Sequence, residues 1–255
     1  MQKKLLLSLF LIIGASNMAT KIYAATTPEL YEQAGLYLVV EGIEGCGKST
    51  FIKGLHTALQ QKQLPVVCTK EPGGSALGLE IRKILEHRTA PTSPVAEFLL
   101  FAADRAQHFA EKVIPYLAQG ITILSDRSCY SALAYQGYLK SVNKEMITAV
   151  NSWAMQQMEP DVIFYLRIEP EVAKNRAIQR NEINSFEAEI LPRMQTLHEA
   201  FDELFNNHPH VIIIDAQLPA QAMVEQALTA LQKKYPERFV APNMYNQQEQ
   251  QLHDY

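Results

Sequence analysis

From residue 36 onward, short apolar runs alternate with longer stretches that have the periodicity of helices. Apolar runs bounded by turn residues are typical of strands buried in a parallel sheet. The runs that predict strands are Leu36 to Val40, Leu64 to Thr69, Ile121 to Leu124, Val162 to Ile168 and Val211 to Ile214. The alternation predicts an α/β fold with an open, mostly parallel five-stranded sheet and helices on both faces.

The stretches between the runs predict amphipathic helices. The predicted helices are Ser49 to Gln61, Leu77 to His87, Val95 to Ala118, Asn143 to Gln157, Glu171 to Arg180, Phe186 to Asn206 and Pro219 to Lys234. In an open α/β sheet, ligands bind at the edge formed by the carboxyl ends of the strands. Segments 42–49, 70–74 and 126–127 all follow strands, so we expect one binding site at that edge.

The segment after the first strand reads G-I-E-G-C-G-K-S-T. Gly42, Gly47, Lys48 and Ser49 match the pattern of a phosphate-binding loop (P-loop), in which backbone N–H groups and a helix N-terminus hold phosphate oxygens. Lys48 is expected to reach the β- and γ-phosphates, and the Ser49 hydroxyl to ligate Mg²⁺. A glycine-rich turn with a chance lysine is the alternative, but the flanking strand and helix favour a sheet of the P-loop NTPase type. The predicted triphosphate site comprises Gly42, Ile43, Glu44, Gly45, Cys46, Gly47, Lys48, Ser49 and Thr50.

Two charged residues follow the third predicted strand. Asp126 is placed to hold Mg²⁺ or its water shell together with Ser49. Arg127 offers a planar charged fork that suits phosphate. The alternative is an Asp–Arg pair on the surface, which contributes only about 0–1 kcal/mol to stability.

Composition changes this picture little. The chain has 255 residues, 47% of them hydrophobic and 20% charged, with a net charge of −4. These values are typical of one globular α/β domain and do not indicate a nucleic-acid or membrane-surface partner. Cys46, Cys68 and Cys129 are too far apart for a zinc site or a disulfide framework. Cys46 lies inside the P-loop, and we expect it to pack as a small apolar side chain.

The two ends differ from the middle of the chain. In residues 1–30, two lysines precede the apolar run Leu5 to Ile13 and small residues follow, which is the layout of a secretory signal peptide. The run is shorter than the roughly 20 residues of a membrane span. A cleaved signal, a membrane-proximal anchor and an extension absent from the working protein all stay open, while a triphosphate substrate favours the cytoplasm. Residues 34–234 form the predicted domain, and the polar segment 235–255 is expected to be disordered.

Four separated motifs resemble those of bacterial thymidylate kinases. They are E-G-I-E-G-C-G-K-S-T, T-K-E-P-G-G-S, L-L-F-A-A-D-R and D-R-S-C-Y-S-A-L-A-Y-Q-G. The resemblance extends from about Leu36 to Leu231. It implies transfer of the γ-phosphoryl group of ATP to dTMP, giving ADP and dTDP, with Mg²⁺ as cofactor and usually with a homodimer as the working unit.

The resemblance also implies roles for single side chains. Phe101 matches the aromatic residue that stacks on thymine, and Arg105, one helical turn later, matches the arginine that reads the base edge. Lys70 stands where the family usually has a phosphate-binding arginine, and the peptide bond before Pro72 is commonly cis. The implied dTMP site comprises Glu44, Lys70, Pro72, Phe101, Arg105, Arg127, Ser131, Tyr135 and Gln136.

Two departures from the family are visible. Ser128 replaces a residue that is usually aromatic or His. In the segment that matches the mobile lid, Asn184 and Ser185 stand where many relatives have Asp followed by Arg or Lys. A cation at such a position contributes about 10³–10⁵ in rate. The implied catalytic residues are Lys48, Glu44, Arg127, Arg176 and Arg180.

The altered lid leaves two other functions open beside dTMP phosphorylation. One is a kinase for another deoxynucleoside or nucleoside monophosphate on the same fold. The other is a nucleotide-binding protein whose catalysis is weakened.

Overall fold

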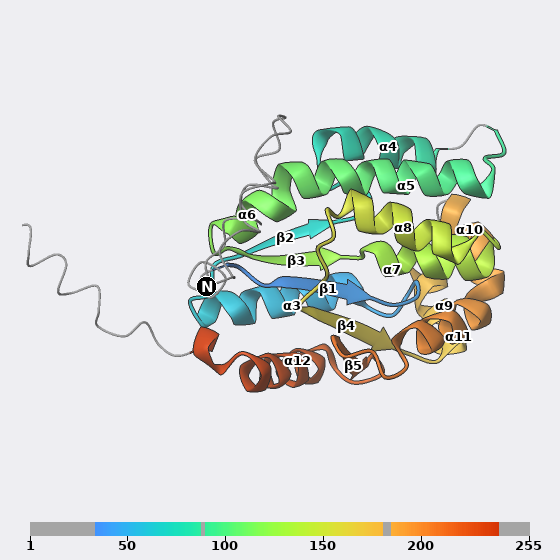
Figure 1. Cartoon of the computed structure of the whole chain (residues 1–255). Helices are drawn as coiled ribbons and strands as arrows, with labels where there is room; N and C mark the ends of the chain where they lie inside the picture. The colour runs from blue at the N-terminus through green and yellow to red at the C-terminus, as the bar shows by residue number, and fades with distance from the viewer. Residues whose placement is uncertain (1–33, 88–89, 181–184, 240–255) are drawn as a thin grey trace, which may run out of the picture. The chain divides into compact units, whose positions relative to one another are not determined.

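The computed structural model describes residues 34–87, 90–180 and 185–239. Its strands form one sheet in the order β2-β3-β1-β4-β5 (Figure 1), and every pairing is parallel. The strands are β1 (Tyr37–Glu41), β2 (Val66–Lys70), β3 (Thr122–Asp126), β4 (Val162–Arg167) and β5 (Val211–Asp215). The predicted α/β fold with a parallel sheet is confirmed, and β2 begins two residues later than the predicted strand.

Helices cover both faces of the sheet. Successive side chains of β1 and β4 point to opposite faces, and each face packs against a layer of helices. The Phe51 ring of α3 (Lys48–Gln61) lies against Phe164 of β4. The Tyr37 ring of β1 points to the other face and lies edge-on to Phe109. In this register Val40 is the partner of Phe164, so Val40 shares the α3 face and Tyr37 faces away from it.

The remaining helices connect the strands and build the walls of the site. They are α4 (Ala76–Glu86), α5 (Pro94–His108), α6 (Ile114–Ala118), α7 (Cys129–Ala132), α8 (Lys144–Ala154), α9 (Pro170–Gln179), α10 (Ser185–Ile190), α11 (Met194–Phe205) and α12 (Ala220–Lys234). Two π-helical segments, η1 (Phe109–Val113) and η2 (Leu133–Leu139), and two 3₁₀ turns, η3 (Leu191–Arg193) and η4 (Pro236–Phe239), complete the described chain.

The predicted long helical stretch over 95–118 is confirmed, but it is not α-helical throughout. α5 ends at His108, the π-helical segment η1 follows, and α6 begins one residue before Pro115. Proline has no N–H to donate and disrupts an α-helical ladder when it lies inside one. The predicted helix over 186–206 is divided in the same way, because Pro192 lies in the 3₁₀ turn η3 between α10 and α11.

The sequence pattern also misses the helical segment 129–139. In η2 the buried residues Ala134 to Gly137 are consecutive, so the segment lacks the 3.6-residue alternation on which helix prediction depends. This segment carries Tyr135 and Gln136 toward the carboxyl edge of the sheet.

The start of the predicted tail is ordered. Residues 236–239 form η4, and Arg238 Nη2 donates a hydrogen bond of 2.6 Å to the carbonyl of Ala34. The rest of that tail and the signal-like segment 1–30 lie outside the described residues. Within the described residues, no helix is both long enough and apolar enough to cross a membrane.

Gly45 gives a stability prediction. Its backbone has φ +77°, and a Cβ placed on it would lie 2.0 Å from the carbonyl oxygen of Ala173 in α9. Gly45→Ala is therefore expected to lower the free energy of unfolding by about 3 kcal/mol, measured by urea denaturation. Gly47→Ala is the matched control, because Gly47 has φ +96° but nothing within 4 Å of the added methyl group. Backbone strain alone should cost about 1 kcal/mol there, and equal losses in both variants would contradict the steric argument.

Candidate functional site

A cavity of about 570 Å³ opens at the carboxyl edge of the sheet. The strand register brings its parts together, because Asp126 of β3 lies level with both Val40 of β1 and Lys70 of β2. The predicted site residues that line the cavity are Glu44, Gly45, Gly47, Lys48, Ser49, Thr50, Lys70, Pro72, Phe101, Arg105, Asp126, Arg127, Ser131, Tyr135, Gln136, Arg176 and Arg180. The cavity thus brings together groups from loops and helices that are far apart in the sequence.

The P-loop leads directly into α3. Gly47 has φ 96° and is the N-cap of this helix, and no side chain caps the helix. The first backbone N–H groups of α3 are therefore available to a ligand at the cavity. Lys48 Nζ donates hydrogen bonds to the carbonyls of Gly42 at 2.8 Å and Ile43 at 3.1 Å. The loop thus presents backbone donors and an ammonium group to an anion.

Three predicted triphosphate-site residues do not line the cavity. Gly42, Ile43 and Cys46 are buried beneath the loop, where the first two provide the carbonyls that hold Lys48. Burial raises the pKa of the Cys46 thiol above its ordinary value. The expectation that Cys46 packs as a small apolar side chain is confirmed, since it belongs to the central apolar cluster.

Glu44 and Arg127 form an ion pair in the cavity. Arg127 Nη2 lies 2.7 Å from Glu44 Oε1, and Nη1 donates to Ser131 Oγ at 3.0 Å. The Tyr135 hydroxyl donates to Glu44 Oε1 at 2.6 Å. Burial alone would lower the pKa of Arg127, but the neighbouring Tyr135 and Glu44 outweigh it and raise that pKa. Glu44 is only 6% exposed, which excludes a solvated loop charge.

Glu41 is a residue that sequence reasoning missed. It ends β1, is fully buried, and accepts hydrogen bonds from the Ser128 N–H at 2.9 Å and the Ser131 hydroxyl at 2.7 Å. Burial raises the pKa of its carboxyl group. Glu41 thereby holds the start of α7 and the hydroxyl that Arg127 contacts. An acidic residue directly after an apolar strand was the available signal.

Asp126 has the properties of a ligand for a hard cation. Its Oδ1 atom is buried and has no hydrogen-bond partner in the described part of the chain. Asp126 and Ser49 line the same cavity, and no group of three or more His, Cys, Asp or Glu side chains suited to a metal occurs among the described residues. One carboxylate with one hydroxyl fits Mg²⁺, which keeps most of its own water. Arg127 pairs with Glu44 rather than with Asp126, so the surface-pair alternative is excluded.

Aromatic side chains form the opposite wall. The half-buried Phe101 ring lies 6.3 Å from the Phe186 ring, and Phe186 is stacked on Tyr135 at 5.8 Å. Phe186 comes from α10 and was not among the predicted site residues, because its position after a polar run carried no periodic signal. The peptide bond between Glu71 and Pro72 is cis, as the resemblance implied.

The arginines of the lid segment have partners in the described chain. Arg176 Nη1 donates to the carbonyl of Ala216 at 2.9 Å, and Arg180 Nη2 lies 2.5 Å from Glu187 Oε1. Both arginines line the cavity. Asn184 falls outside the described residues, and of Ser185 only its place at the start of α10 is described.

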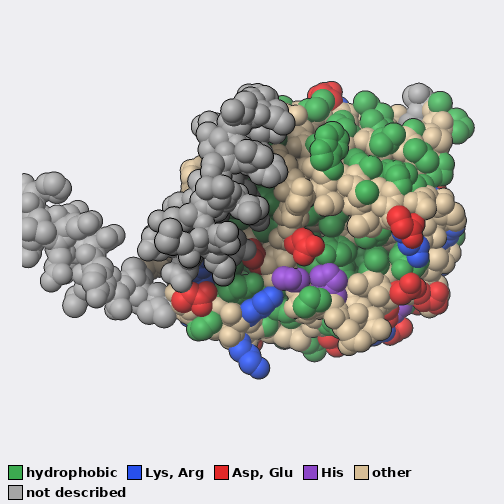
Figure 2. Space-filling model, viewed as in Figure 1, with side chains coloured by type: hydrophobic (Ala, Val, Ile, Leu, Met, Phe, Trp, Pro, Cys, Tyr) green, Lys and Arg blue, Asp and Glu red, His purple; other side chains and the backbone are tan. Residues whose placement is uncertain are grey.

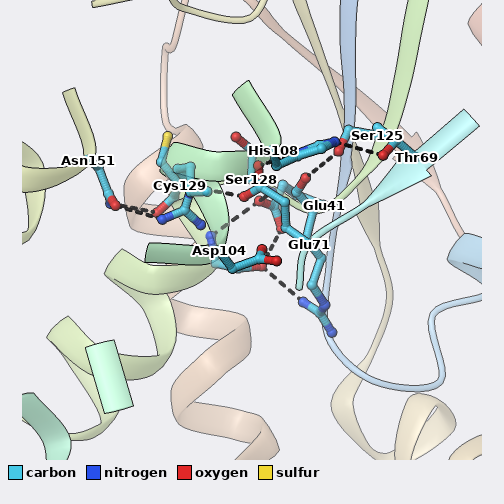
Figure 3. A network of polar contacts seen from close by, with 12 residues as sticks. Glu41, Thr69, Glu71, Asp104, His108, Ser125, Ser128, Cys129 and Asn151 are labelled. Carbon is cyan, nitrogen blue, oxygen red and sulfur yellow. Dashed lines mark hydrogen bonds and ion pairs between the residues drawn. The ribbon is translucent and has the colours of Figure 1, made fainter. Parts of the chain in front are cut away.

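Behind Arg105 lies a buried polar cluster that sequence reasoning also missed (Figure 3). Glu71, Asp104 and His108 belong to it, and each is at most 5% exposed. Asp104 Oδ1 accepts the Gly73 N–H at 2.9 Å, whereas its Oδ2 atom is buried and has no hydrogen-bond partner in the described segments.

Asp104 gives a prediction for the pH dependence of stability. Burial raises the pKa of Asp104 from 3.8 to about 6. Between about pH 4 and pH 6 the folded protein therefore holds a proton that the unfolded chain has lost, and stability from this group is lost as the pH rises through 6. The Asp104→Asn variant lacks this titrating group. Between pH 4 and pH 7 its free energy of unfolding, measured with urea, should therefore fall by about 3 kcal/mol less than that of the wild-type protein. Parallel pH profiles for the two proteins would contradict the prediction.

Comparison with known proteins identifies relatives of the chain. The family model described as thymidylate kinase matches residues 40–227. The thymidylate kinase of Carboxydothermus hydrogenoformans is 36% identical over 191 residues, which cover 75% of this chain and 94% of that protein. The thymidylate kinase of Synechococcus sp. is 38% identical over 199 residues, covering 75% and 93%. The thymidylate kinase of Bacillus cereus strain Q1 is 35% identical over 205 residues, covering 78% and 98%.

Proposed function

This chain belongs to the thymidylate kinase family, and from that premise we propose that it transfers the γ-phosphoryl group of ATP to dTMP, giving ADP and dTDP. The observation that carries the proposal is the meeting of Lys48, Arg127 and the orphan carboxylate oxygen of Asp126 in one cavity. Phosphoryl transfer requires these groups, because positioning and charge neutralisation supply nearly all of the rate.

The P-loop takes the ATP side of the cavity in this proposal. Its inward N–H groups and Lys48 bind the β- and γ-phosphates, and Thr50 and Ser49 continue the cradle into the first turn of α3. Arg176 of α9 and Arg180, the C-cap of that helix, line the same cavity and supply positive charge to the transferring group. Arg180 must exchange its pairing with Glu187 to do so.

The acceptor occupies the side bounded by Phe101, Tyr135 and the cis-Pro72 loop. Phe101 stacks on the thymine base, a contact that contributes about 1–3 kcal/mol. Arg127 and Lys70 bind the acceptor phosphate, and Glu44 holds Arg127 in the direction of that phosphate. The acceptor phosphate then lies close to the P-loop, because Arg127 and the P-loop line one continuous cavity.

Ser49 and Asp126 would hold Mg²⁺. When bound, the ion would neutralise charge on the phosphate oxygens. Asp126→Asn is expected to raise the Mg²⁺ concentration for half-maximal activity at least about tenfold, because the neutral amide is a poorer ligand than the carboxylate. A Mg²⁺ titration of initial rate at saturating nucleotides measures this, with the surface variant Asp215→Asn as control. An unchanged Mg²⁺ requirement would remove Asp126 from the proposal.

A coupled assay of ADP release tests the proposed reaction directly. Full-length protein, ATP and Mg²⁺ are combined with dTMP, dUMP, UMP or thymidine, and nucleotide products are separated by chromatography. We expect dTMP to be phosphorylated faster than dUMP, UMP or thymidine. Phosphorylation of thymidine in preference to dTMP would assign the neighbouring kinase activity, and tight nucleotide binding with background turnover would overturn the kinase assignment.

We propose a homodimer as the working unit. Large apolar side chains are exposed on the helices beside β2, and Figure 2 shows apolar side chains gathered over that part of the molecule. The most exposed are Leu77, Leu79 and Ile84 of α4, Val95 and Leu99 of α5, and Trp153 of α8. A monomer rarely leaves such a group uncovered. Sedimentation equilibrium is expected to give twice the chain mass, and Leu99→Glu to shift it toward the monomer.

We further propose that residues 34–234 are the catalytic domain and that the enzyme works in the cytoplasm, where ATP is supplied. N-terminal sequencing of the native protein tests the second statement. A mature start near Ala25 would instead establish a cleaved signal.

A further inference from the structure

The buried polar cluster forms hydrogen bonds to the Arg105 side chain. Arg105 Nε donates to Glu71 Oε2 at 2.8 Å, and Nη1 donates to Asn151 Oδ1 at 2.6 Å. The side chain is 2% exposed, yet it lines the cavity. Nη2 has no hydrogen bond to any residue of the described chain, so it is the nitrogen left for a ligand.

Glu71 is itself held from behind. Its second oxygen, Oε1, lies 2.9 Å from His108 Nδ1, and His108 Nε2 lies 2.7 Å from Thr69 Oγ1 (Figure 3). Burial alone would raise the pKa of Glu71, but Arg105 and His108 outweigh it and lower that pKa. The carboxyl group is therefore ionised and can only accept, which makes Nδ1 the protonated nitrogen of His108.

The cluster has little room to rearrange. A Cβ on Gly74 would lie 2.3 Å from His108 Cδ2, so the loop after Pro72 packs directly on the imidazole ring. Asn151 is 3% exposed, and its Nδ2 donates to the carbonyl of Cys129 at 3.4 Å. The residue after β2 (Glu71), α5 (His108) and α8 (Asn151) thus each contribute one side chain to a single closely packed arrangement.

We propose that Glu71, His108 and Asn151 are positioning residues that fix Arg105 so that Nη2 points a donor at the base of the acceptor nucleotide. This inference rests on the proposed function. An arginine donates and never accepts. A fixed Nη2 therefore favours a base with a carbonyl oxygen at this edge, as in uracil and thymine, over one with an exocyclic amine, as in cytosine. The cluster thereby determines selection for a keto pyrimidine monophosphate.

Calorimetric binding of dUMP and dCMP to the full chain tests the proposal, because these two ligands share sugar and phosphate and differ at the base edge. Wild-type protein should bind dUMP more tightly than dCMP. Asn151→Ala and His108→Phe are each expected to reduce that preference about tenfold, since a loosened guanidinium no longer enforces one direction. The KM for dTMP should rise by a similar factor, with the KM for ATP unchanged.

Three further variants separate positioning from a general loss of structure. His108→Asn keeps a donor for Glu71 and should retain most of the preference. Thr69→Val is isosteric and should reduce the preference for dUMP by a smaller factor. It serves as the test variant if the Asn151 and His108 substitutions unfold the protein. Tyr165→Phe is the control. It removes a hydrogen bond of 2.8 Å from the Tyr165 hydroxyl to Asp202, neither of which lines the cavity, and should leave the preference for dUMP unchanged.

The outcomes are distinguishable. Folded Asn151 and His108 variants with an undiminished dUMP preference, or a wild type without one, would overturn the inference. Equal losses in the Tyr165 control would do the same. A wild type that prefers dUMP over dCMP in binding but phosphorylates no monophosphate would instead overturn the proposed function and leave the positioning role supported.

Discussion

Lys48→Ala is expected to reduce kcat for dTMP phosphorylation by about 10³-fold or more. The Lys48 ammonium is the only cation within the P-loop, and preorganised charge at the transferring phosphoryl group is the largest contribution to this type of catalysis. Stopped samples of the ATP and dTMP reaction, separated by chromatography, measure turnover down to background.

Lys53→Ala is the matched control for this change. Lys53 lies on the same helix, α3, but is exposed and does not line the cavity. Its loss should leave kcat within about twofold. Lys48 also bonds to two carbonyls of its own loop, so the thermal midpoint of each variant must be recorded beside the rate. A folded Lys48→Ala protein that retains a tenth of the wild-type rate would remove this lysine from the mechanism.

Arg127→Ala is expected to lower kcat/KM for dTMP by about 10²–10³-fold. Arg127 contacts Glu44 and Ser131, and its backbone has φ 73°, so the chain accepts strain to aim this guanidinium into the cavity. Removal of the side chain also leaves the buried Glu44 carboxylate without its cation, and this carboxylate then repels the acceptor phosphate. Initial rates over a range of dTMP concentrations measure the effect.

Two controls locate this effect in the acceptor site. Arg127→Lys keeps the charge but lacks the fork, and should retain part of the lost activity. Arg167→Ala removes another arginine at a strand end, one that pairs with Asp202 at 2.7 Å and does not line the cavity. It should leave kcat/KM nearly unchanged, and an equal loss in that variant would mean that the Arg127 effect is a loss of structure.

The sheet and most of the cavity follow from local signals in the sequence. Apolar runs of four to seven residues predicted all strands, since the central strands β1, β3 and β4 are almost entirely buried and the edge strands β2 and β5 are still rich in apolar residues. Gly42, Gly47 and Lys48 predicted the P-loop for an equally local reason. The carboxyl ends of parallel strands meet at one edge, so Asp126 and Lys70 could be placed beside the P-loop before any contact was known.

Other parts of the site depend on partners that are distant in the sequence. Glu71 and His108 are 37 positions apart and Glu41 and Ser128 are 87 apart, so no window of the sequence shows either pair. The π-helical segment η2 was missed because its run of consecutive buried residues does not follow the α-helical period. The buried polar groups of this site therefore became visible only in three dimensions.

The contact between Gly45 and the Ala173 carbonyl has a consequence for motion. Arg176 lies three positions after Ala173 on α9, so the two are neighbours on one helix surface, and Arg180 is the C-cap of this helix. Since there is no room for even a methyl group at Gly45, α9 has no space to advance onto the loop. The two backbones already touch, so α9 lies as close to the P-loop as the chain allows. This contact therefore sets the shortest distance at which α9 can present Arg176 to the P-loop.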